Sequence, residues 1–319
     1  MDFHALLGND ALKQRLSVSL SRGQLSHCYL LSGPVGSGKH TLARLLAAAM
    51  QCTAASRPCG QCSQCRKALS GLHPDVITVD DPERKTIPVR LVRDTCADLY
   101  IRPNEGSKKI YLFPRAQDLN SQGQNALLKC IEEPPAYGVF LLLAEHPEQL
   151  LPTIRSRCVE LSLSPLGDAL LRSALSARFP DASSDALHSA MLRSGGYLGQ
   201  AIDLLSEGTE LLPQTKAFAE AFCEGNAGAL LRVLTPMERL KREQLRPILL
   251  QWTELVSSAA TSRSGLPAIG PECKKIAQSR TDAQLLHAVE ALQNAITLTD
   301  ANAGTAHICG MLCVKLSES

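Results

Sequence analysis

A glycine-rich segment of this chain has the residue types and the spacing of a phosphate-binding loop. The segment from Gly33 to Lys39 reads Gly-Pro-Val-Gly-Ser-Gly-Lys and matches the start of the pattern G-x-x-x-x-G-K-[ST]. In this pattern the backbone N–H groups surround a phosphate, and the lysine reaches the terminal phosphates. The last position ordinarily supplies a hydroxyl that holds Mg²⁺, whereas here it is His40, with Thr41 one place later. The site is therefore degenerate, its occupancy by ATP or ADP is left open, and its candidate cofactor-binding residues are Gly33, Gly36, Gly38, Lys39 and Thr41.

The acidic residues that hydrolysis requires are missing from the position where they are expected. Hydrolysis of a nucleoside triphosphate needs carboxylates at the end of a neighbouring strand, which hold the metal and help to orient the attacking water. The apolar run 110–113 is the strand placed for this role, and it continues into Pro114 and Arg115. An arginine about 6 Å from Mg²⁺ would be repelled by roughly 5 kcal/mol at an effective dielectric constant of about 20. We therefore expect no ATPase activity from this chain on its own.

Four cysteines form a compact cluster with the spacing of a metal site. The pattern C-x6-C-x2-C-x2-C, with two overlapping C-x-x-C steps, is formed by Cys52, Cys59, Cys62 and Cys65. Four thiolates suit tetrahedral Zn²⁺, and because they leave no open coordination position, the zinc is expected to be structural. Four unligated thiols, a redox site and an iron–sulfur cluster are the alternatives that the spacing leaves open. The other eight of the 12 cysteines are scattered through apolar segments, and we expect them to be free, buried thiols.

The elements that must position these residues alternate between short apolar runs and amphipathic stretches. Runs as continuously apolar as 28–31 and 140–143 are typical of parallel strands with both faces buried. The alternation predicts an α/β domain with a parallel sheet and flanking helices, built from right-handed crossovers. Strands are predicted at 28–31, 76–79, 110–113, 140–143 and 159–163, and helices between them at 39–50, 89–100 and 121–131.

The strand pattern ends near residue 163, and the remaining sequence is predicted to be helical. The predicted domains are an α/β domain at 1–164, with a zinc module at 52–65, a small helical lid domain at 165–208 and an all-α domain at 209–319. Within the last domain, helices are expected at 214–224, 240–262, 281–298 and 305–317.

The composition is that of a folded protein with two or three domains. The chain has 319 residues, of which 45% are hydrophobic. Lys and Arg number 33 against 31 Asp and Glu, and this balance argues against a protein that coats nucleic acid, although it would hide a local basic patch. No apolar run approaches the ~20 residues of a membrane span, and the first residues do not have the pattern of a secretory signal. We therefore expect a soluble, cytoplasmic protein without a membrane partner.

Three further sequence blocks occur in an order that resembles a known family. The block 125–135 reads NALLKCIEEPP, the apolar run 140–144 follows it, and Ser156-Arg157-Cys158 comes next. Together with the phosphate-binding loop, this order resembles the AAA+ clamp-loader subunits of bacterial DNA polymerase III, which are related to replication factor C. The resemblance is strong over residues 5–165 and loose in the helical remainder.

The departures from the family pattern are similar to those of the delta-prime type of subunit, in which the ATPase site is degenerate. The motor subunits of the family carry an acid pair where this chain has Pro114 and Arg115. They carry a polar residue where the run 140–144 ends here in alanine, followed by Glu145. Their second domain supplies an arginine near the position of Gly199, and it is absent here.

The resemblance implies a role for Arg157 at the active site of another subunit. A subunit of the delta-prime type presents an arginine finger to the ATP of its neighbour, and Arg157 matches that position. A planar guanidinium at the edge of an α/β domain can neutralise charge on a neighbour's γ-phosphate. The alternative is a surface salt bridge with Glu132 or Glu133, and nearby Arg155 is a second candidate for the finger.

The same resemblance implies the partners of the chain. It indicates a hetero-pentameric clamp loader with tau/gamma and delta subunits, joined through a helical collar and belonging to the DNA polymerase III holoenzyme. This loader places the sliding clamp on primer-template DNA, and its subunits carry a similar zinc module after the helix of the phosphate-binding loop. Two rival functions remain: a tau/gamma-like ATPase motor subunit, and a zinc-dependent nucleic-acid-binding module with a vestigial phosphate-binding loop.

Overall fold

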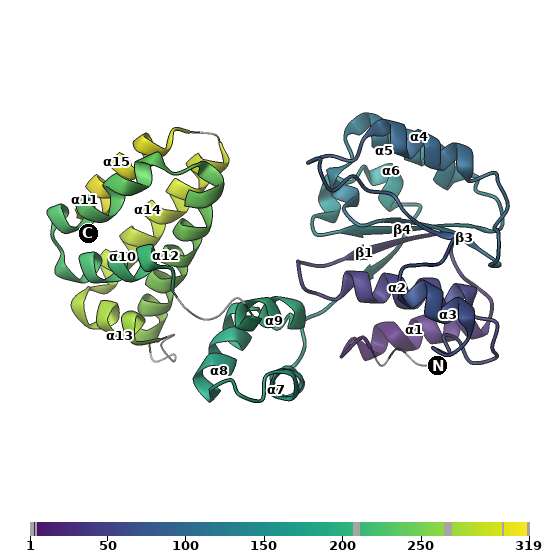
Figure 1. Ribbon diagram of the computed structural model, residues 1–319, viewed down its shortest axis with the longest axis horizontal. Coiled ribbons are helices and arrows are strands. Elements are labelled where there is room, and N and C mark those ends of the chain that lie inside the picture. Colours follow the sequence, from purple (N-terminus) through teal and green to yellow (C-terminus); the bar gives the residue numbers. More distant parts are fainter. Residues whose placement is uncertain (1–2, 4, 207–210, 265–269, 302, 318–319) are drawn as a thin grey trace. The chain divides into compact units, whose positions relative to one another are not determined.

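The computed structural model describes residues 3, 5–206, 211–264, 270–301 and 303–317 of the chain. These residues belong to two compact units, one made of residues 1–182 and 190–206 and the other of residues 183–189 and 207–319. The first unit contains an α/β fold, and the described part of the second unit is helical (Figure 1). The predicted boundary between residues 208 and 209 lies outside the described residues, and the division into three domains stays a prediction.

Five parallel strands form the sheet of the first unit, in the order β2-β3-β4-β1-β5. β1 lies between β4 and β5, so that Tyr29 is paired with Leu141 on one side and with Val159 on the other. All residues of β1 and β4 are buried, as expected for parallel strands covered on both faces. The five predicted strands are confirmed as β1 (Cys28–Ser32), β2 (Val76–Thr78), β3 (Lys109–Phe113), β4 (Gly138–Ala144) and β5 (Val159–Ser162).

Helices cover both faces of the sheet, which gives the α/β fold three layers (Figure 1). Alternate residues of β1 point to opposite faces, because successive side chains alternate along a strand. Tyr29 and Leu31 join the core on one face, and Cys28 and Leu30 join the core on the other. The first face is covered by α1 (Asp10–Ser21), α2 (Lys39–Gln51) and α3 (Ser63–Leu69), and the second by α4 (Val89–Asp98), α5 (Ser121–Glu132) and α6 (Pro152–Arg155).

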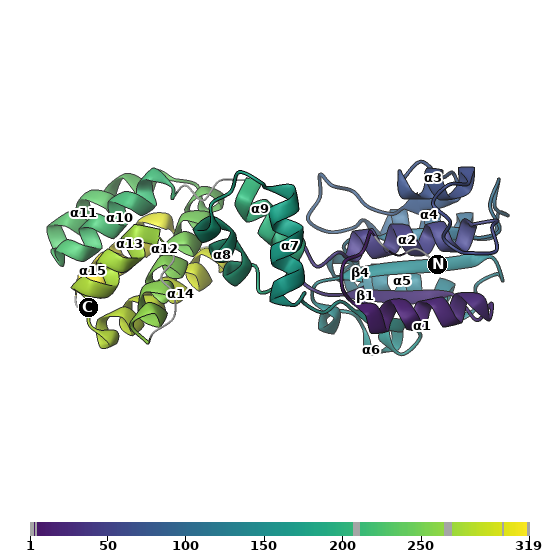
Figure 2. The same ribbon diagram turned by 90° about the horizontal axis from the view of Figure 1, so that it is seen from below.

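The described residues after β5 form helices. In the core of the second unit, Trp252 is fully buried and stacks on Phe218, with ring centroids 4.0 Å apart. This stack joins α12 to α10 within a bundle of helices (Figure 2), and such aromatic contacts bury large apolar areas. The helices are α7 (Asp168–Arg178), α8 (Ser184–Arg193), α9 (Leu198–Ser206), α10 (Pro213–Glu224), α11 (Ala227–Leu234), α12 (Arg242–Arg263), α13 (Gly270–Ser279), α14 (Asp282–Asp300) and α15 (Thr305–Ser317).

The predicted helices are confirmed where the repeating apolar pattern extends over many residues. The three predicted between strands correspond to α2, α4 and α5, and the four predicted near the carboxyl end correspond to α10, α12, α14 and α15. The prediction misses α1, α3, α6, α11 and α13, and of these α3 and α11 have only 7 and 8 residues, too few for a 3.6-residue period to stand out. None of the described helices is both long and apolar enough to cross a membrane.

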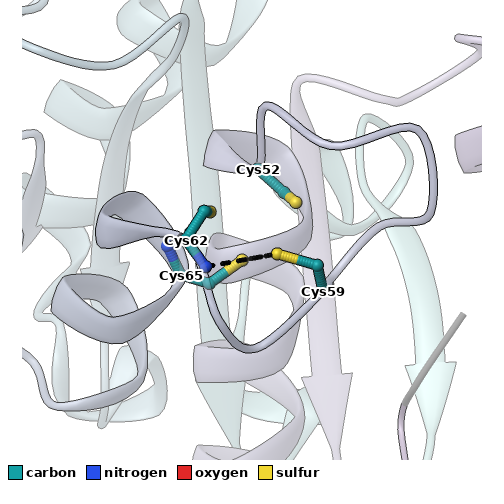
Figure 3. A group of neighbouring side chains, drawn as sticks. All are labelled: Cys52, Cys59, Cys62 and Cys65. Atoms are coloured by element: carbon teal, nitrogen blue, oxygen red, sulfur yellow. Dashed lines mark hydrogen bonds between the residues drawn. The ribbon is translucent and has the colours of Figure 1, made fainter.

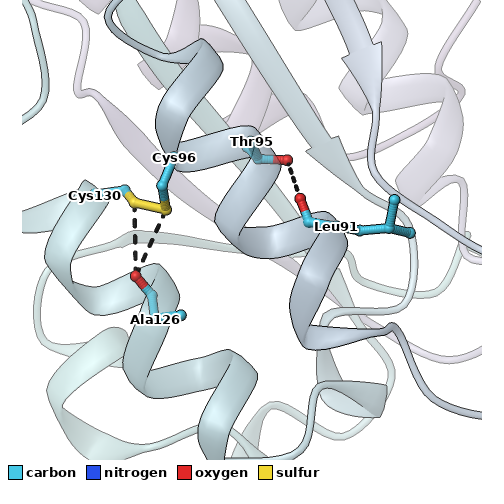
Figure 4. The surroundings of a disulfide bond; sticks show 5 residues. All are labelled: Leu91, Thr95, Cys96, Ala126 and Cys130. Carbon is cyan, nitrogen blue, oxygen red and sulfur yellow. Dashed lines mark hydrogen bonds between the residues drawn. A yellow bond between two sulfur atoms is a disulfide. The ribbon is translucent and has the colours of Figure 1, made fainter.

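Cys96 and Cys130 form a disulfide bond, which corrects the prediction that all the scattered cysteines are free thiols (Figure 4). The neighbouring helices α4 and α5 carry one cysteine each and bring their Cα atoms to 5.8 Å. That distance lies within the range of about 4.4–6.8 Å that disulfides require. The pairing depends on how two helices pack, so the sequence spacing does not reveal it. The free cysteines outside the cluster of four are Cys28, Cys158, Cys223, Cys273, Cys309 and Cys313.

A buried carboxylate holds a loop at the edge of the sheet where the strands begin, beside the cysteine cluster. Asp75, directly before β2, is fully buried and accepts hydrogen bonds of 2.6–2.8 Å from the backbone N–H groups of Asn104, Glu105 and Gly106. Burial raises the pKa of Asp75, but these hydrogen bonds outweigh that effect and hold the pKa below its ordinary value. The Glu105 carboxylate also pairs with Lys67 of α3, so the loop joins the helix of the cysteine cluster to the sheet.

Asp75→Ala is expected to lower the free energy of unfolding by about 2–4 kcal/mol, because it leaves three backbone donors without their acceptor. Since the folded-state pKa of Asp75 lies below the ordinary value, the contribution of this carboxylate is present above about pH 4. It is lost as the pH falls through the folded-state pKa. Urea unfolding between about pH 3 and pH 7 measures both effects.

Asp94→Ala is the matched control, because Asp94 is 65% exposed and pairs with Arg90 on the surface of α4. Its effect on the free energy of unfolding is expected to be small. A stability of Asp75→Ala equal to that of the control at neutral pH would contradict the anchoring role of Asp75.

Candidate functional site

The phosphate-binding loop lies between β1 and α2, at the carboxyl edge of the sheet. β1 ends at Ser32, and α2 begins at Lys39. Gly36 and Gly38 turn the chain with φ angles of +71° and +95°, which residues with a side chain rarely adopt. The turn brings together all the predicted cofactor-binding residues, namely Gly33, Gly36, Gly38, Lys39 and Thr41.

The amine of Lys39 is bound inside this loop. Its Nζ donates hydrogen bonds to the carbonyl oxygens of Gly33, at 2.5 Å, and Pro34, at 2.8 Å, and the residue is 5% exposed. Burial lowers the pKa of Lys39, an effect that the Glu145 carboxylate partly opposes. A phosphate entering the loop would have to replace both carbonyl groups as partners of the amine.

The first turn of α9 closes the loop. The backbone N–H of Gly199 donates to the carbonyl oxygen of Gly36 at 2.9 Å. The approach is so close that a Cβ atom at Gly199 would lie 2.5 Å from the Cα atom of Gly36. Gly199 has no side chain and therefore lets the two backbones touch. A pocket of about 300 Å³ lies beside this contact, lined by residues 5–7, by the first turn of α2 and by the start of α9.

The hydroxyl that normally holds Mg²⁺ is displaced along α2. His40 is exposed and Thr41 is half-buried, and both line the pocket. Successive residues of an α-helix point about 100° apart, so the Thr41 hydroxyl does not take the direction of the residue before it. The loop keeps a phosphate-binding backbone but lacks the hydroxyl at the usual metal-binding position.

Arg115 follows β3 and is bound by two acidic residues, Asp80 from the loop after β2 and Asp118 from the turn that directly follows Arg115. Its Nη2 atom lies 2.7 Å from Asp80 Oδ1, and its Nη1 atom lies 3.1 Å from Asp118 Oδ2. The hydrogen bond to Asp80 is the main cause that raises the pKa of Arg115. The guanidinium also donates to the carbonyl oxygens of Asp81 and Arg84. Arg115 therefore holds the loop after β2 in place.

The four cysteines predicted to bind zinc are brought together between α2 and α3 (Figure 3). Their Sγ atoms all lie within 4.8 Å of one another. Tetrahedral Zn²⁺ with Zn–S bonds of about 2.3 Å places its sulfur ligands about 3.8 Å apart. The Sγ atoms of Cys59 and Cys65 are 3.9 Å apart, so the donor set fits this ion.

Backbone groups prepare two of these thiols for ionisation. The N–H of Cys65 donates to Cys62 Sγ at the start of α3 and lowers the pKa of Cys62 to about 6. The N–H of Cys62 likewise lowers the pKa of Cys59. Cys65 differs, because it is fully buried and burial raises its pKa to about 12. A thiolate in such a place needs a cation beside it, which a metal ion would supply.

Arg157 forms a salt bridge within its own chain. Its Nη2 atom lies 3.0 Å from Glu132 Oε1 at the end of α5, and its Nη1 atom donates to the carbonyl oxygen of Thr153 at 3.0 Å. The salt bridge with Glu132 that was named as the alternative is therefore present, and the role of Arg157 at another subunit stays a prediction. Arg155, the second candidate, has Nη2 3.9 Å from Glu160 Oε2.

Arg157 and the phosphate-binding loop lie at opposite edges of the sheet. Gly33 directly follows β1, whereas Arg157 comes two residues before β5. These two strands are parallel and neighbouring, with Tyr29 paired to Val159. At about 3.3 Å per residue, the length of the strands separates Arg157 from Gly33 by roughly 15–20 Å. This distance exceeds the reach of an arginine side chain.

Sequence reasoning missed several residues that shape these sites. Asp80 binds Arg115, but it lies 35 residues away in the sequence and no spacing marks it. The contact of Gly36 with Gly199 joins two segments far apart in the chain, and no local spacing in the sequence indicates it. In each case the missing information is a contact between segments that only the fold brings together.

Known proteins match the α/β part of the chain. Residues 8–167 match the family described as DNA polymerase III, delta subunit. The delta' subunit of DNA polymerase III from Pseudomonas aeruginosa is 38% identical over 179 residues, which cover 55% of this chain and 54% of that protein. The tau subunit from Salmonella typhimurium is 37% identical over 166 residues, which cover 51% of this chain and 26% of that protein. The chain thus matches about half or less of the length of these relatives.

A solved structure has the same fold over most of the chain. The crystal structure of a DNA polymerase III gamma subunit-related protein from Thermotoga maritima has a TM-score of 0.51 and 16% identity, and covers 95% of this chain and 97% of that protein. At this identity the likeness concerns the fold alone. The family match is more specific, because it includes the phosphate-binding loop, the cysteine cluster and the segment of Arg157. The chain belongs to the DNA polymerase III delta-subunit family, within the AAA+ clamp-loader proteins.

Proposed function

We propose that this chain is a delta-prime-type subunit of the clamp loader, which does not hydrolyse ATP itself and supplies Arg157 to the ATP of a neighbouring subunit. The observation that carries the proposal is the separation of Arg157 from the chain's own phosphate-binding loop by the length of two paired parallel strands. An arginine at the amino edge does not reach a nucleotide held by the same chain, but it can meet one held by another. The relatives named as delta' and tau subunits support a neighbour from the same family.

The chain's own loop supports the absence of hydrolysis. The amine of Lys39 is bound by carbonyl groups of the loop, and the backbone of Gly199 rests on Gly36. Arg115 stands where a metal-binding acid is needed. Without ligands for Mg²⁺, the negative charge on the transferred phosphoryl group would not be neutralised. The loop therefore serves as part of the scaffold.

Arg157 can change partner at a small energetic cost. Its salt bridge with Glu132 lies on the surface, with side chains that are 39% and 48% exposed. Such pairs contribute about 0–1 kcal/mol. The γ-phosphate of a neighbour's ATP carries more negative charge than one carboxylate, and it accepts paired hydrogen bonds from a guanidinium. Glu132 thereby orients the arginine until a nucleotide replaces it.

We also infer that the four clustered cysteines hold one structural Zn²⁺. The Sγ positions fit tetrahedral coordination, and four thiolates leave no place for a reactive water. The ion would cross-link the end of α2 to the start of α3, which are otherwise joined by the loop 52–62. Its contribution is to the folding of this segment.

The proposed partners are the tau/gamma and delta subunits of a hetero-pentameric loader in the cytoplasm. The loader would bring the chain to the sliding clamp and to primer-template DNA. The helical residues 209–319 are proposed as the collar that joins the subunits. The family of the chain and the names of its relatives support this assignment.

Arg157→Ala is expected to leave folding and assembly intact and to lower the DNA-stimulated ATPase activity of the reconstituted loader. At the site that receives the arginine, the rate should fall by about 10³-fold or more. The total ATP turnover of the loader should fall by the fraction that this site contributes. ATP hydrolysis by the complex with primed DNA and clamp measures this loss.

Arg155→Ala is the matched control, because Arg155 lies two residues away and is similarly exposed, at 41%. Its loader is expected to turn over ATP at the wild-type rate. Unchanged turnover in Arg157→Ala, or an equal loss in both variants, would contradict the role assigned to Arg157.

The purified chain is expected to show no magnesium-dependent ATP turnover above background, since its site lacks the metal-binding acids. Lys39→Ala should then change nothing in the same assay. The rival function as a tau/gamma-like ATPase predicts turnover by the lone chain that Lys39→Ala abolishes. A phosphate-release assay distinguishes the two outcomes.

Cys62→Ser is expected to reduce the zinc content from one ion per chain to nearly none, because three thiolates bind Zn²⁺ much more weakly than four. Metal analysis after gel filtration measures the content. Cys223→Ser, which changes a half-buried free thiol of α10, should retain the zinc. Iron in place of zinc, or no bound metal in the wild-type chain, would contradict the assignment.

A further inference from the structure

A second pair of cysteines lies close together in the first unit, apart from the cluster of four. The Sγ atoms of Cys28 and Cys158 are 3.0 Å apart, compared with about 2.05 Å in a disulfide bond. Cys28 is the first residue of β1 and is fully buried. Cys158 directly precedes β5 and is half-buried. Closing the remaining gap of about 1 Å would join them covalently.

The register of the sheet favours this bond. β1 and β5 are parallel, and Tyr29 lies opposite Val159. Continuing this register by one residue toward the amino end of both strands places Cys28 opposite Cys158. Paired residues on neighbouring strands have Cα atoms about 4.8 Å apart, within the range of about 4.4–6.8 Å for disulfides. Both sulfurs lie on the face covered by α4 and α5. Because Cys158 precedes the paired part of β5, its backbone can shift without breaking the ladder of hydrogen bonds.

We propose that Cys28 and Cys158 are a redox modification site, which forms an intramolecular disulfide when the chain reacts with a low-molecular-weight disulfide such as oxidised glutathione. The same face of the sheet holds the disulfide of Cys96 and Cys130, so the four cysteines of this face lie in two pairs. The hydrogen bond with Cys158, together with burial, raises the pKa of Cys28. The half-buried Cys158 is therefore the thiol that reacts first.

The modification consists of two thiol–disulfide exchanges. The thiolate of Cys158 attacks one sulfur of oxidised glutathione, whose S–S bond breaks, and one glutathione thiolate leaves. The thiolate of Cys28 then attacks Cys158 Sγ, and the second glutathione thiolate leaves. Two protein thiols are oxidised and one glutathione disulfide is reduced. The protons released by the two cysteines are taken up by the two glutathione thiolates.

The bond would act on Arg157, and this consequence rests on the function proposed above. Arg157 directly precedes Cys158, and its guanidinium is already bound by Glu132. A covalent bond to Cys28 would fasten the backbone beside Arg157 to the central part of the sheet. The arginine would then adapt less well to a neighbour's phosphate, so oxidation is expected to lower the turnover of the loader.

Peptide mapping of the full-length chain tests the modification directly. The chain is equilibrated with reduced and oxidised glutathione in the presence of Zn²⁺, free thiols are blocked with N-ethylmaleimide, and digests are analysed by mass spectrometry. We expect a peptide in which Cys28 is joined to Cys158, the loss of both residues from the alkylated set, and their recovery after dithiothreitol.

Matched variants control for other cysteines. Cys158→Ser, at the less buried position, is expected to abolish the cross-linked peptide, and Cys28→Ala provides a second test at the buried position. Cys313→Ser, which removes another half-buried free thiol, should leave the cross-link intact. Glutathione attached to Cys158 while Cys28 stays alkylated would overturn the proposal. Alkylation of both Cys28 and Cys158, under conditions that keep Cys96 and Cys130 joined, would also overturn it.

The reconstituted loader separates this proposal from the function on which its consequence rests. The oxidised wild-type chain is expected to give lower ATPase activity that dithiothreitol restores, whereas Cys158→Ser should give no response to oxidation. A cross-linked peptide without any change in turnover would overturn the effect on Arg157 and leave the modification standing. If Arg157→Ala also has no effect on turnover, the proposed function itself is wrong.

Discussion

The parallel pairing of β1 with β5 is the constraint on which the functional arrangement depends. Because both strands run in the same direction, the segment that follows β1 and the segment that precedes β5 must lie at opposite edges of the sheet. The phosphate-binding loop occupies one edge and Arg157 occupies the other. No side-chain rearrangement brings them together, since the separation is the length of the strands themselves. In an assembly of such chains, however, the amino edge of one sheet can face the carboxyl edge of the next.

The charged groups of Lys39 and Arg115 are satisfied from within the chain. A buried amine without a partner is costly, and the carbonyl oxygens of Gly33 and Pro34 provide partners for Lys39. The guanidinium of Arg115, which follows β3, is likewise bound by Asp80. In the function proposed above, the amine of Lys39 is a group that a phosphate in the loop would otherwise need. Under that proposal, the contacts that order the loop also oppose the binding of a phosphate.

Local sequence patterns predicted the strands, and they also predicted the cluster of four cysteines, whose members lie close together along the chain. The continuous apolar runs of β1 and β4 predicted parallel strands, and the spacing from Cys52 to Cys65 predicted a site whose sulfur atoms are indeed neighbours. The contacts that could not be predicted join distant segments. The bond between Cys96 and Cys130 spans 34 residues, and Cys28 meets Cys158 across 130. Such contacts follow from the packing of helices and strands, which no local spacing records.

The amino edge of the sheet combines firmly held groups with one that is held weakly. Asp75 is buried under three backbone hydrogen bonds, and the buried amine of Lys109 lies 2.9 Å from a carboxylate oxygen of Asp98. Removing the carboxylate of Asp75 would leave three backbone donors unsatisfied, at a cost of a few kcal/mol. The amine of Lys109 is also held by the carbonyl oxygens of Asp98 and Ile101. Arg157 differs, because its partner Glu132 is exposed and water can replace it. The edge thus combines an exposed guanidinium with buried groups that are held by several hydrogen bonds. The role proposed for Arg157 at a neighbouring subunit requires this combination.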